Sequence, residues 1–297
     1  MHRILISGAS GFVGSNLSIY LRNKEHIVSS ISLRGNWKAD PNNDVYIHLA
    51  GIEKDTKNVS DNNEYLKVNS YLTLDFYQAF LNSDAKIFIF FSSCKAVLDS
   101  SLEPISETSK MDPQTEYGKS KLLAENLIND IELPYEKKLF ILRPCLIHGP
   151  GDRGNLKHLF NLVSKNIPWP LVAFENKRSF CSIENLLFII KELIEREDIP
   201  TGIYNVADDE PLSTNELIGL IAKSQNRNPK VWNFSKKFIE SVASIGDKLH
   251  LPLNTERLHK LTSSYVVSNA KIKAAIGKPL PLSSREGLLK TFKSFNS

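Results

Sequence analysis

A tyrosine and a lysine stand four residues apart in this chain, at Tyr117 and Lys121. In a helix, this spacing places both side chains on one face. A phenol with a pKa of about 10 exchanges protons poorly at neutral pH, and a neighbouring ammonium lowers that pKa because it stabilises the phenolate. The pair is therefore a candidate proton donor or acceptor, although the same spacing also occurs on ordinary helix surfaces.

A second candidate site lies near the N-terminus, where Gly8, Gly11 and Gly14 follow an apolar run and precede a helical pattern. A dinucleotide pyrophosphate needs backbone N–H groups and a helix N-terminus close to it, which a turn without side chains permits. Because the strand, turn and helix follow in that order, a purely structural turn is the weaker reading. The segment predicts nicotinamide dinucleotide binding, with contacts from Gly8, Ser10, Gly11, Phe12, Val13 and Gly14.

The end of the second expected strand bears on the type of dinucleotide. That strand reads Ser32-Leu33-Arg34-Gly35 at its end and offers no carboxylate for a ribose 2′-hydroxyl. A guanidinium at this point can bind a 2′-phosphate through two hydrogen bonds, which favours NADP(H) over NAD(H). An exposed arginine without this function is the alternative for Arg34.

Short apolar runs alternate with helical patterns over the first half of the chain. Buried strands are expected at 4–7, 27–33, 45–50, 87–91 and 139–142, and helices at 12–23, 64–82 and 117–130. This alternation predicts an α/β fold with a doubly wound parallel sheet. The segment 44–51, expected to be the third or fourth strand of the sheet, ends in Leu49, Ala50 and Gly51. Its small C-terminal residues would let the backbone approach the cofactor, while His48 is expected to be a core residue.

The pattern changes after Pro144, with a glycine-rich turn, a helix expected over 156–165, and proline-rich chain. Capping boxes at Ser213 with Glu216 and at Ser283 with Glu286 predict two further helix starts. We therefore expect a dinucleotide-binding domain over residues 1–150 plus about 180–208. A smaller substrate-binding lobe is expected over about 151–179 and 209–297.

Composition excludes several classes of protein. A net charge of +4 in 297 residues is too small and scattered to predict nucleic-acid or membrane partners, although anionic small molecules remain candidates. The three widely spaced cysteines form no CxxC or Cys/His cluster, so neither a disulfide framework nor a metal site is expected. With no signal sequence or long apolar stretch, a cytoplasmic location is expected.

The order of these motifs resembles the extended short-chain dehydrogenase/reductase family. The resemblance runs from Ile4 to about Leu289 and includes a strand ending FFSS at 90–93, the tyrosine and lysine, LRP at 142–144, HGPG at 148–151 and SNAK at 268–271. It implies a Rossmann-like fold with a C-terminal substrate-binding lobe. It also implies that Ser92 and Pro144 contact the cofactor and that Tyr117 and Lys121 are catalytic.

Within that family, the stretches GPG at 149–151, RGNL at 153–156 and NKRS at 176–179 resemble enzymes of UDP-hexosamines, including 4-epimerases and 4-ketoreductases. The resemblance implies that Asn155 and Arg178 contact the substrate diphosphate. The family usually has Ser or Thr where this chain has Cys94, a weak hydrogen-bond donor. Either Ser93 takes over that catalytic and substrate-binding position, or Tyr117 acts with Lys121 alone.

The sequence predicts three functions, given below in order of preference, and disfavours a fourth, dehydration. Related dehydratases carry an Asp-Glu pair where this chain has Lys95 and Ala96, so elimination of water is disfavoured. Arg34 favours NADP(H)-dependent reduction of a UDP-4-keto-6-deoxy-N-acetylhexosamine for surface polysaccharide synthesis. The alternatives are an NAD-dependent UDP-N-acetylhexosamine or UDP-glucose 4-epimerase and a non-catalytic NADP-sensing regulator, which usually lacks the tyrosine. The resemblance also implies a homodimer formed by the helices at 64–82 and 117–130.

Overall fold

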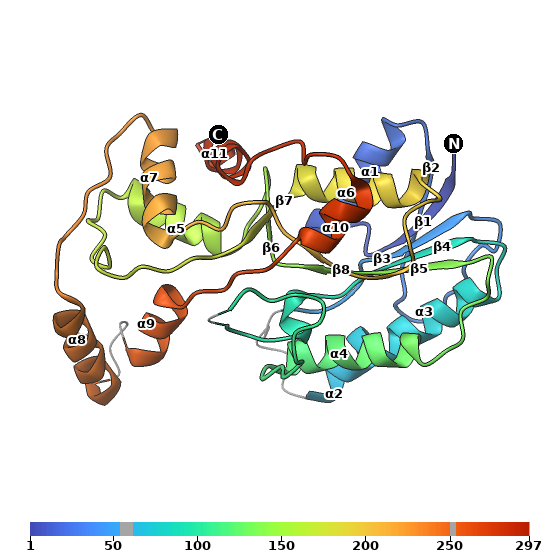
Figure 1. Ribbon diagram of the computed structural model, residues 1–297, viewed down its shortest axis with the longest axis horizontal. Coiled ribbons are helices and arrows are strands. Elements are labelled where there is room, and N and C mark those ends of the chain that lie inside the picture. The colour runs from blue at the N-terminus through green and yellow to red at the C-terminus, as the bar shows by residue number, and fades with distance from the viewer. Residues whose placement is uncertain (54–61, 102, 250–253, 297) are drawn as a thin grey trace.

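The computed structural model describes residues 1–53, 62–101, 103–249 and 254–296. A six-stranded parallel sheet lies at its centre, in the order β2-β1-β3-β4-β5-β8 (Figure 1). The chain crosses over between neighbouring strands through helices, as the alternating sequence pattern predicts. The strands are β1 (Arg3–Ser7), β2 (Ile27–Ile31), β3 (Val45–His48), β4 (Ile87–Phe91), β5 (Lys138–Pro144) and β8 (Gly202–Val206).

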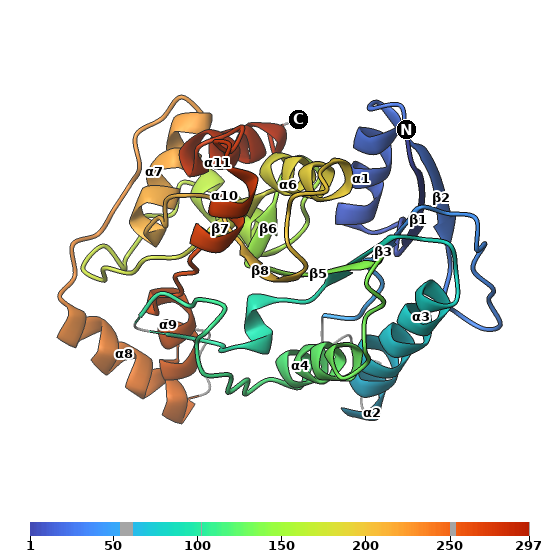
Figure 2. The same ribbon diagram turned by 45° about the vertical axis from the view of Figure 1, so that its right-hand side comes forward.

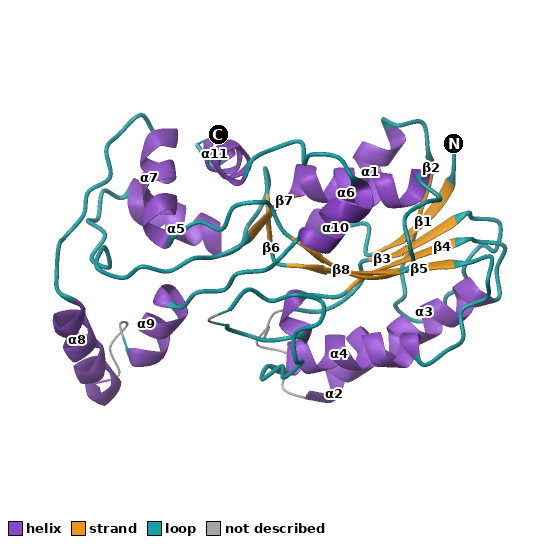
Figure 3. Ribbon diagram, in the orientation of Figure 1, coloured by secondary structure: helices purple, strands orange, loops and turns teal. Residues whose placement is uncertain are grey.

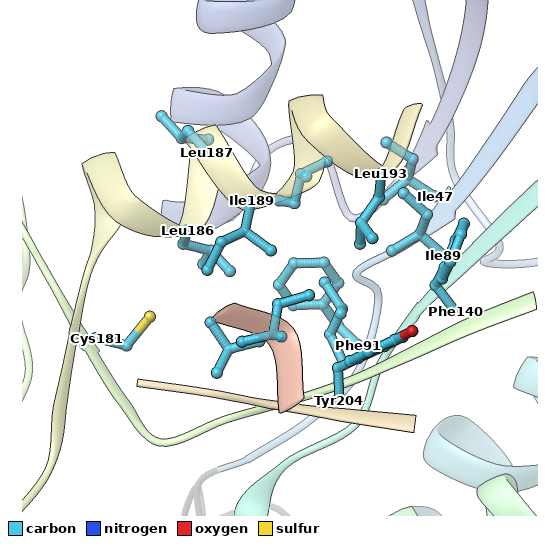
Figure 4. Close-up of a cluster of buried hydrophobic side chains, with 14 of the residues drawn as sticks. Ile47, Ile89, Phe91, Phe140, Cys181, Leu186, Leu187, Ile189, Leu193 and Tyr204 are labelled. Atoms are coloured by element: carbon cyan, nitrogen blue, oxygen red, sulfur yellow. The ribbon is translucent and has the colours of Figure 1, made fainter. Parts of the chain in front are cut away.

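Helices cover both faces of this sheet (Figure 3). On one face lie α1 (Phe12–Arg22), α6 (Ile183–Glu195) and α10 (Ala270–Ile276), and on the other α3 (Leu72–Leu81) and α4 (Glu116–Asn129). Figure 4 shows the core on the α6 side, where Leu186, Ile189 and Leu193 face Ile47 and Ile89. Apolar side chains on both faces of the strands explain why the strands read as continuous hydrophobic runs.

The second expected strand is shorter and more exposed than predicted. It ends at Ile31 instead of Leu33, and Ile27 is half exposed, whereas β1 and β3 are buried. The prediction of burial on both faces was wrong here because β2 is the edge strand of the sheet. β3 likewise ends at His48, two residues before the expected boundary.

The helix expected over 64–82 is interrupted. It consists of α2 (Asn62–Tyr65), a π-helical turn η1 (Leu66–Tyr71) and α3. The side chain of Asn69 in the π-helical turn accepts a hydrogen bond from Ile52 N at 2.8 Å and donates to Ser120 Oγ at 3.0 Å. These contacts with two other segments accompany the π-helical turn. Hydrophobic periodicity predicts a continuous α-helix here, because it does not depend on such contacts.

The remaining elements form a second group beside the carboxyl ends of the strands (Figure 2). They are β6 (Leu146–His148), β7 (Phe180–Ser182), α5 (Asn155–Ser164), α7 (Thr214–Ser224), α8 (Lys236–Leu249), α9 (Thr255–Thr262) and α11 (Ser284–Ser294). Both predicted capping boxes are confirmed, at the starts of α7 and α11. The division into two domains stays a prediction. Ile272 and Ile276 of α10 lie in the same core cluster as Ile4, so this late segment also contacts the sheet.

Candidate active site

A cleft of about 470 Å³ opens at the carboxyl edge of the sheet. This edge is common to all six strands because they run parallel, and Ser7 at the end of β1 is paired with Ile31 of β2 and His48 of β3. The cleft brings together residues that are far apart in the sequence. The predicted residues that line it are Gly8, Gly11, Phe12, Val13, Gly14, Leu49, Gly51, Ser92, Ser93, Tyr117, Lys121, Pro144 and Asn155.

The three glycines of the turn serve three different purposes. Gly8 has φ +73°, which favours glycine, and a Cβ there would lie 2.6 Å from Ala50 N. A Cβ on Gly14 would lie 2.3 Å from Gly8 O, so helix α1 could not pack on the turn. A Cβ on Gly11, in contrast, would meet only Gly8 O at 3.4 Å. The protein itself tolerates a side chain at Gly11, which therefore leaves space in the cleft for a ligand.

Helix α1 begins at this turn with Gly11 as its N-cap, and no side chain caps it. Its first backbone N–H groups and the positive end of its dipole therefore face the turn, as a bound diphosphate requires. Together with the space above Gly11, this arrangement fits the pyrophosphate of a nicotinamide dinucleotide.

Helix α4 presents the tyrosine and the lysine. Thr115 caps this helix by accepting a hydrogen bond from Gly118 N at 3.2 Å, so Tyr117 lies in its first turn and Lys121 follows one turn later. The Lys121 ammonium donates to Phe91 O at 2.8 Å and lies 5.0 Å from the centre of the Phe90 ring. Burial lowers the pKa of Lys121 to about 8, because it penalises the ammonium more than the neutral amine.

The pKa of Tyr117 is not lowered in the protein chain, contrary to what the neighbouring Lys121 ammonium predicts. Burial of the phenol, followed by the charge of Glu53, raises the pKa of Tyr117, and a hydrogen bond with the Ser93 side chain lowers it by less. The prediction from the neighbouring ammonium was wrong because it neglected the loss of solvent around the ring. The phenol is therefore protonated at neutral pH, the form that donates a proton.

Ser93 and Cys94 differ in what they contact. Ser93 lines the cleft beside Tyr117, and its side chain lowers the pKa of the phenol, as expected of the catalytic hydroxyl. Cys94 is 1% exposed and its thiol donates to Arg143 O at 2.9 Å, away from the cleft lining. Burial raises the pKa of this thiol, so it remains protonated. The structure therefore favours Ser93 over Cys94 as the neighbour of the tyrosine.

Four other predicted residues also lie outside the cleft lining: Ser10, Arg34, Ala50 and Arg178. Arg34 is exposed and follows the end of β2, at the same edge of the sheet as the glycine turn. Arg178 is half-buried, with its backbone hydrogen-bonded to Leu212 in both directions. Among the described residues, neither guanidinium has a hydrogen-bond or ion-pair partner.

His48 is the core residue that the sequence predicts. It is fully buried, with Nδ1 2.7 Å from Ser7 Oγ and Nε2 2.9 Å from Thr73 Oγ1. Burial, with a smaller contribution from the Lys121 charge, lowers the pKa of His48 to about 3. The imidazole is therefore neutral and holds β1 to α3. It does not line the cleft.

Several residues that the sequence analysis missed hold the cleft-lining segments in place. The Asn69 side-chain amide accepts from Ile52 N at 2.8 Å and donates to Ile52 O at 2.9 Å, and so holds one wall of the cleft. Ser92 donates to the Glu125 carboxylate, which also accepts from Arg143 Nε at 2.9 Å in a buried ion pair. In the sequence, these residues were marked only by their type: Asn69 is a polar residue in a helical pattern, and Glu125 and Arg143 are charged residues among apolar neighbours.

Further cleft residues come from the loop before α5. Asp152, Arg153 and Gly154 line the cleft beside Asn155, and Asp152 Oδ1 accepts from Gly154 N at 2.8 Å. Cys145 also lines the cleft, and all three cysteines are free and buried.

In the part of the chain that the structure describes, no cluster of His, Cys, Asp and Glu could hold a metal ion. Within the same residues, no helix has the length and apolar character needed to span a membrane.

Comparison with known proteins places this site in a family. A UDP-glucose 4-epimerase of Vibrio cholerae is 26% identical, and the match covers 98% of this chain and 95% of that protein. A GDP-6-deoxy-D-mannose reductase of Pseudomonas aeruginosa is 25% identical over 74% of this chain and 79% of its own length. The fold is also that of RMD from Pseudomonas aeruginosa complexed with NADPH, with a TM-score of 0.73, 20% identity and 99% coverage of both chains.

The model of the NAD dependent epimerase/dehydratase family matches residues 4–207, which contain the glycine turn, the tyrosine and the lysine. All the residues that line the cleft described above lie within this range. The chain therefore belongs to the NAD dependent epimerase/dehydratase family and is an NAD(P)-dependent nucleotide-sugar enzyme of the extended short-chain dehydrogenase/reductase type.

Proposed function

We propose that this enzyme reduces the 4-keto group of a UDP-4-keto-6-deoxy-N-acetylhexosamine with NADP(H), in the synthesis of surface polysaccharide precursors. The observation that carries the proposal is the strand end after β2, where Arg34 is exposed and free among the described residues. Ser32 and Leu33 precede it, so the strand end offers a guanidinium and no carboxylate. That chemistry suits a 2′-phosphate better than a 2′-hydroxyl.

The chain's own residues account for the proton transfer. Tyr117 starts as a neutral phenol and donates its proton to the alkoxide oxygen that forms at C4. Ser93, which lines the cleft beside Tyr117, orients the phenol and the substrate oxygen. The Lys121 ammonium, held by Phe91 O, stabilises the phenolate left behind. The bound nicotinamide cofactor supplies the hydride to the carbonyl carbon.

Two polar groups suit the diphosphate of the substrate. Asn155 is the first residue of α5 and lines the cleft, so its amide and the helix N-terminus both face the site. Arg178 is half-buried without a described partner, and burial lowers its pKa. A half-buried cation without a described partner has lost part of its hydration, and a phosphate oxygen would compensate for that loss. We assign both residues to the substrate diphosphate.

A UDP-N-acetylhexosamine or UDP-glucose 4-epimerase is the second candidate. The observation that favours it is the similarity to the Vibrio cholerae UDP-glucose 4-epimerase over nearly the whole chain. In that reaction Tyr117 first accepts the C4 hydroxyl proton and later returns a proton. A non-catalytic NADP-sensing protein is disfavoured, because the cleft keeps Tyr117, Lys121 and Ser93 together.

The first experiment identifies the cofactor. Nucleotide released from the denatured, freshly purified protein is identified, and KM for NADPH and NADH is measured for wild type and Arg34→Asp. We expect no retained NAD, a preference for NADPH, and at least about a tenfold rise in the KM for NADPH in the variant. Lys38→Asp, an exposed cation four residues away, is the matched control and should change neither KM. Tightly retained NAD would contradict the reductase proposal.

The second experiment follows the reaction itself. A UDP-4-keto-6-deoxy-N-acetylhexosamine with NADPH should consume absorbance at the reduced-nicotinamide band, and UDP-glucose or UDP-N-acetylglucosamine alone should not be epimerised. Tyr117→Phe should lower kcat by about 100-fold or more while NADPH binding is retained. Epimerisation without added NADPH would establish the second candidate instead.

We also propose that the enzyme is a homodimer that pairs α3 and α4 with the same helices of a second copy. Tyr71, at the junction of the π-helical turn and α3, is half exposed and would be covered in such a four-helix interface. Tyr71→Arg should shift the mass measured by light scattering from dimer to monomer. A monomeric wild type would contradict this proposal.

A further inference from the structure

Helix α8 and the segment before it carry an exposed apolar surface. Its members are Val231, Trp232, Phe234, Phe238, Ile245 and Leu249, each between 37 and 64% exposed. We call these six residues the α8 patch. Scattered single apolar residues on a surface need no explanation, whereas a contiguous group indicates a binding surface.

The aromatic members of the patch are in contact with one another. The Trp232 and Phe234 rings are 5.6 Å apart edge to face, and the Phe234 and Phe238 rings are 5.2 Å apart. The backbone of the same segment is fixed, because Trp169 N donates to Lys230 O and Trp232 N donates to Trp169 O, both at 2.9 Å. The patch is therefore preformed and requires little ordering when it binds.

The apolar arc of α8 is wider than the part that the protein covers. Ile239 and Ala243 face inward and pack in a cluster with Leu258 of α9. At 100° per residue, Phe238, Ile245 and Leu249 fall on the adjoining sector of the helix, and all three are exposed. One half of the apolar arc thus anchors the helix and the other half faces solvent.

Charge is arranged asymmetrically around this exposed sector. Lys237 and Lys248 fall together on its free side, just beyond Ser241, whereas Glu240, Asp247 and Lys236 fall on the far side of the helix. Asp247 is also occupied by a hydrogen bond from Thr255 N at 3.0 Å. Residues 227–249 contain five basic and two acidic side chains, so the segment is cationic in a chain with a net charge of only +4.

We propose that the α8 patch binds the surface of an anionic phospholipid bilayer. Trp, Phe, Ile and Leu on one sector with lysines on its free side are the composition of a helix that lies in the membrane interface. Lysine side chains there reach anionic headgroups while their methylene chains stay in apolar surroundings. Lysine is depleted from protein–protein interfaces, which makes a second protein the weaker match.

The position of α8 in the molecule suits this contact. Figures 1 and 2 both show α8 at the periphery, at the end of the molecule away from β2. All six residues of the patch are exposed at this peripheral position, so they are accessible to a partner surface. The proposal does not depend on which of the two reactions the cleft catalyses.

Vesicle sedimentation tests the proposal with the full chain. Wild-type protein is mixed with vesicles of phosphatidylcholine alone or with 30% phosphatidylglycerol (about one anionic lipid in three) at low and high salt. We expect binding to the anionic vesicles that weakens with salt, and little binding to the neutral ones. No sedimentation with anionic vesicles at low salt would overturn the proposal.

Matched variants locate the binding surface. Ile245→Ser should lower the vesicle partition coefficient about tenfold, whereas Ile19→Ser, at a similarly exposed isoleucine on α1, should leave it unchanged. Lys237→Glu with Lys248→Glu should abolish the preference for anionic lipid without removing apolar surface. Melting temperature and cofactor binding check that each variant is folded. Equal binding of Ile245→Ser and Ile19→Ser would contradict the assignment to α8.

Tryptophan fluorescence supplies an independent readout. Of the three tryptophans, Trp232 is half exposed, Trp169 is buried and Trp37 is partly buried, so anionic vesicles should shift the emission of Trp232 to shorter wavelength. Trp232→Phe should lose that shift and still sediment. If Ile245→Ser instead converts an oligomer into a monomer and the wild type never binds vesicles, the patch is a protein interface and the lipid proposal is wrong.

Discussion

Lys121 is a buried cation whose charge the fold does not fully compensate. Its pKa is about 8 in the folded protein, below the ordinary value of 10.5, because burial outweighs the nearby carboxylates. Between these pH values the unfolded chain binds more protons than the folded one, so Lys121 makes the free energy of unfolding rise with pH. The slope from this residue is at most about 1.4 kcal/mol per pH unit.

Denaturant unfolding of wild type, Lys121→Met and Lys119→Met from pH 7 to 11 measures this effect. The difference in unfolding free energy between wild type and Lys121→Met should change in favour of wild type above about pH 8. Lys119 lies two residues earlier on the same helix, but it is exposed. Its variant should give a curve parallel to that of wild type. Parallel curves for all three proteins would contradict the buried ammonium.

Asn69 is predicted to position one wall of the cleft without touching substrate. Asn69→Ala leaves both the N–H and the C=O of Ile52 without their side-chain partner, and unfolding free energy should fall by about 2 kcal/mol. Because Asn69 and Lys121 both approach Gly51, kcat should fall more than KM rises. Asn126→Ala, an exposed asparagine on α4, is the control for stability and for kinetics. If Asn69→Ala changed neither the unfolding free energy nor the kinetics, other contacts would hold this wall of the cleft.

At the scale of the elements, the glycine turn connects β1 to α1. Its glycines have separate predicted roles, since we expect Gly14 to be needed for folding and Gly11 for dinucleotide binding. Gly14→Ala places a Cβ 2.3 Å from Gly8 O and should lower the unfolding free energy by about 3 kcal/mol. Gly11→Ala should cost at most about 1 kcal/mol at the N-cap but weaken dinucleotide binding at least about tenfold. Gly219→Ala, in open space on α7, should stabilise the protein slightly without changing dinucleotide affinity. Unchanged dinucleotide affinity in Gly11→Ala would contradict the assignment of the glycine turn to pyrophosphate binding.

At the scale of the whole molecule, α11 near the C-terminus supports the substrate end of the cleft. Leu288 of α11 is fully buried in one cluster with Leu156 and Phe160 of α5, the helix that begins with Asn155. Leu288→Ala should cost about 2–5 kcal/mol and raise KM for the nucleotide sugar while the affinity for the dinucleotide is retained. Leu193→Ala, in the core beside the sheet, should cost similar stability without that selectivity. Equal effects on both ligands would mean that the two ends of the cleft are not separately supported.

The sequence by itself determined the features that depend on neighbouring residues. The glycine turn, the helical pairing of Tyr117 with Lys121, the two capping boxes and the alternation of strands and helices are all local. Periodicity, steric limits and capping hydrogen bonds act within a few residues, so they can be read from the chain. The parallel sheet and its site at the carboxyl edge followed from that alternation.

Only the tertiary structure decided the features that depend on distant contacts. The edge position of β2, the π-helical turn around Asn69, and the buried pairing of Glu125 with Arg143 all arise between segments far apart in the sequence. The direction of the Tyr117 pKa shift belongs here as well. A pKa depends on how much solvent the fold removes from a group, and that burial exists only after the layers have packed.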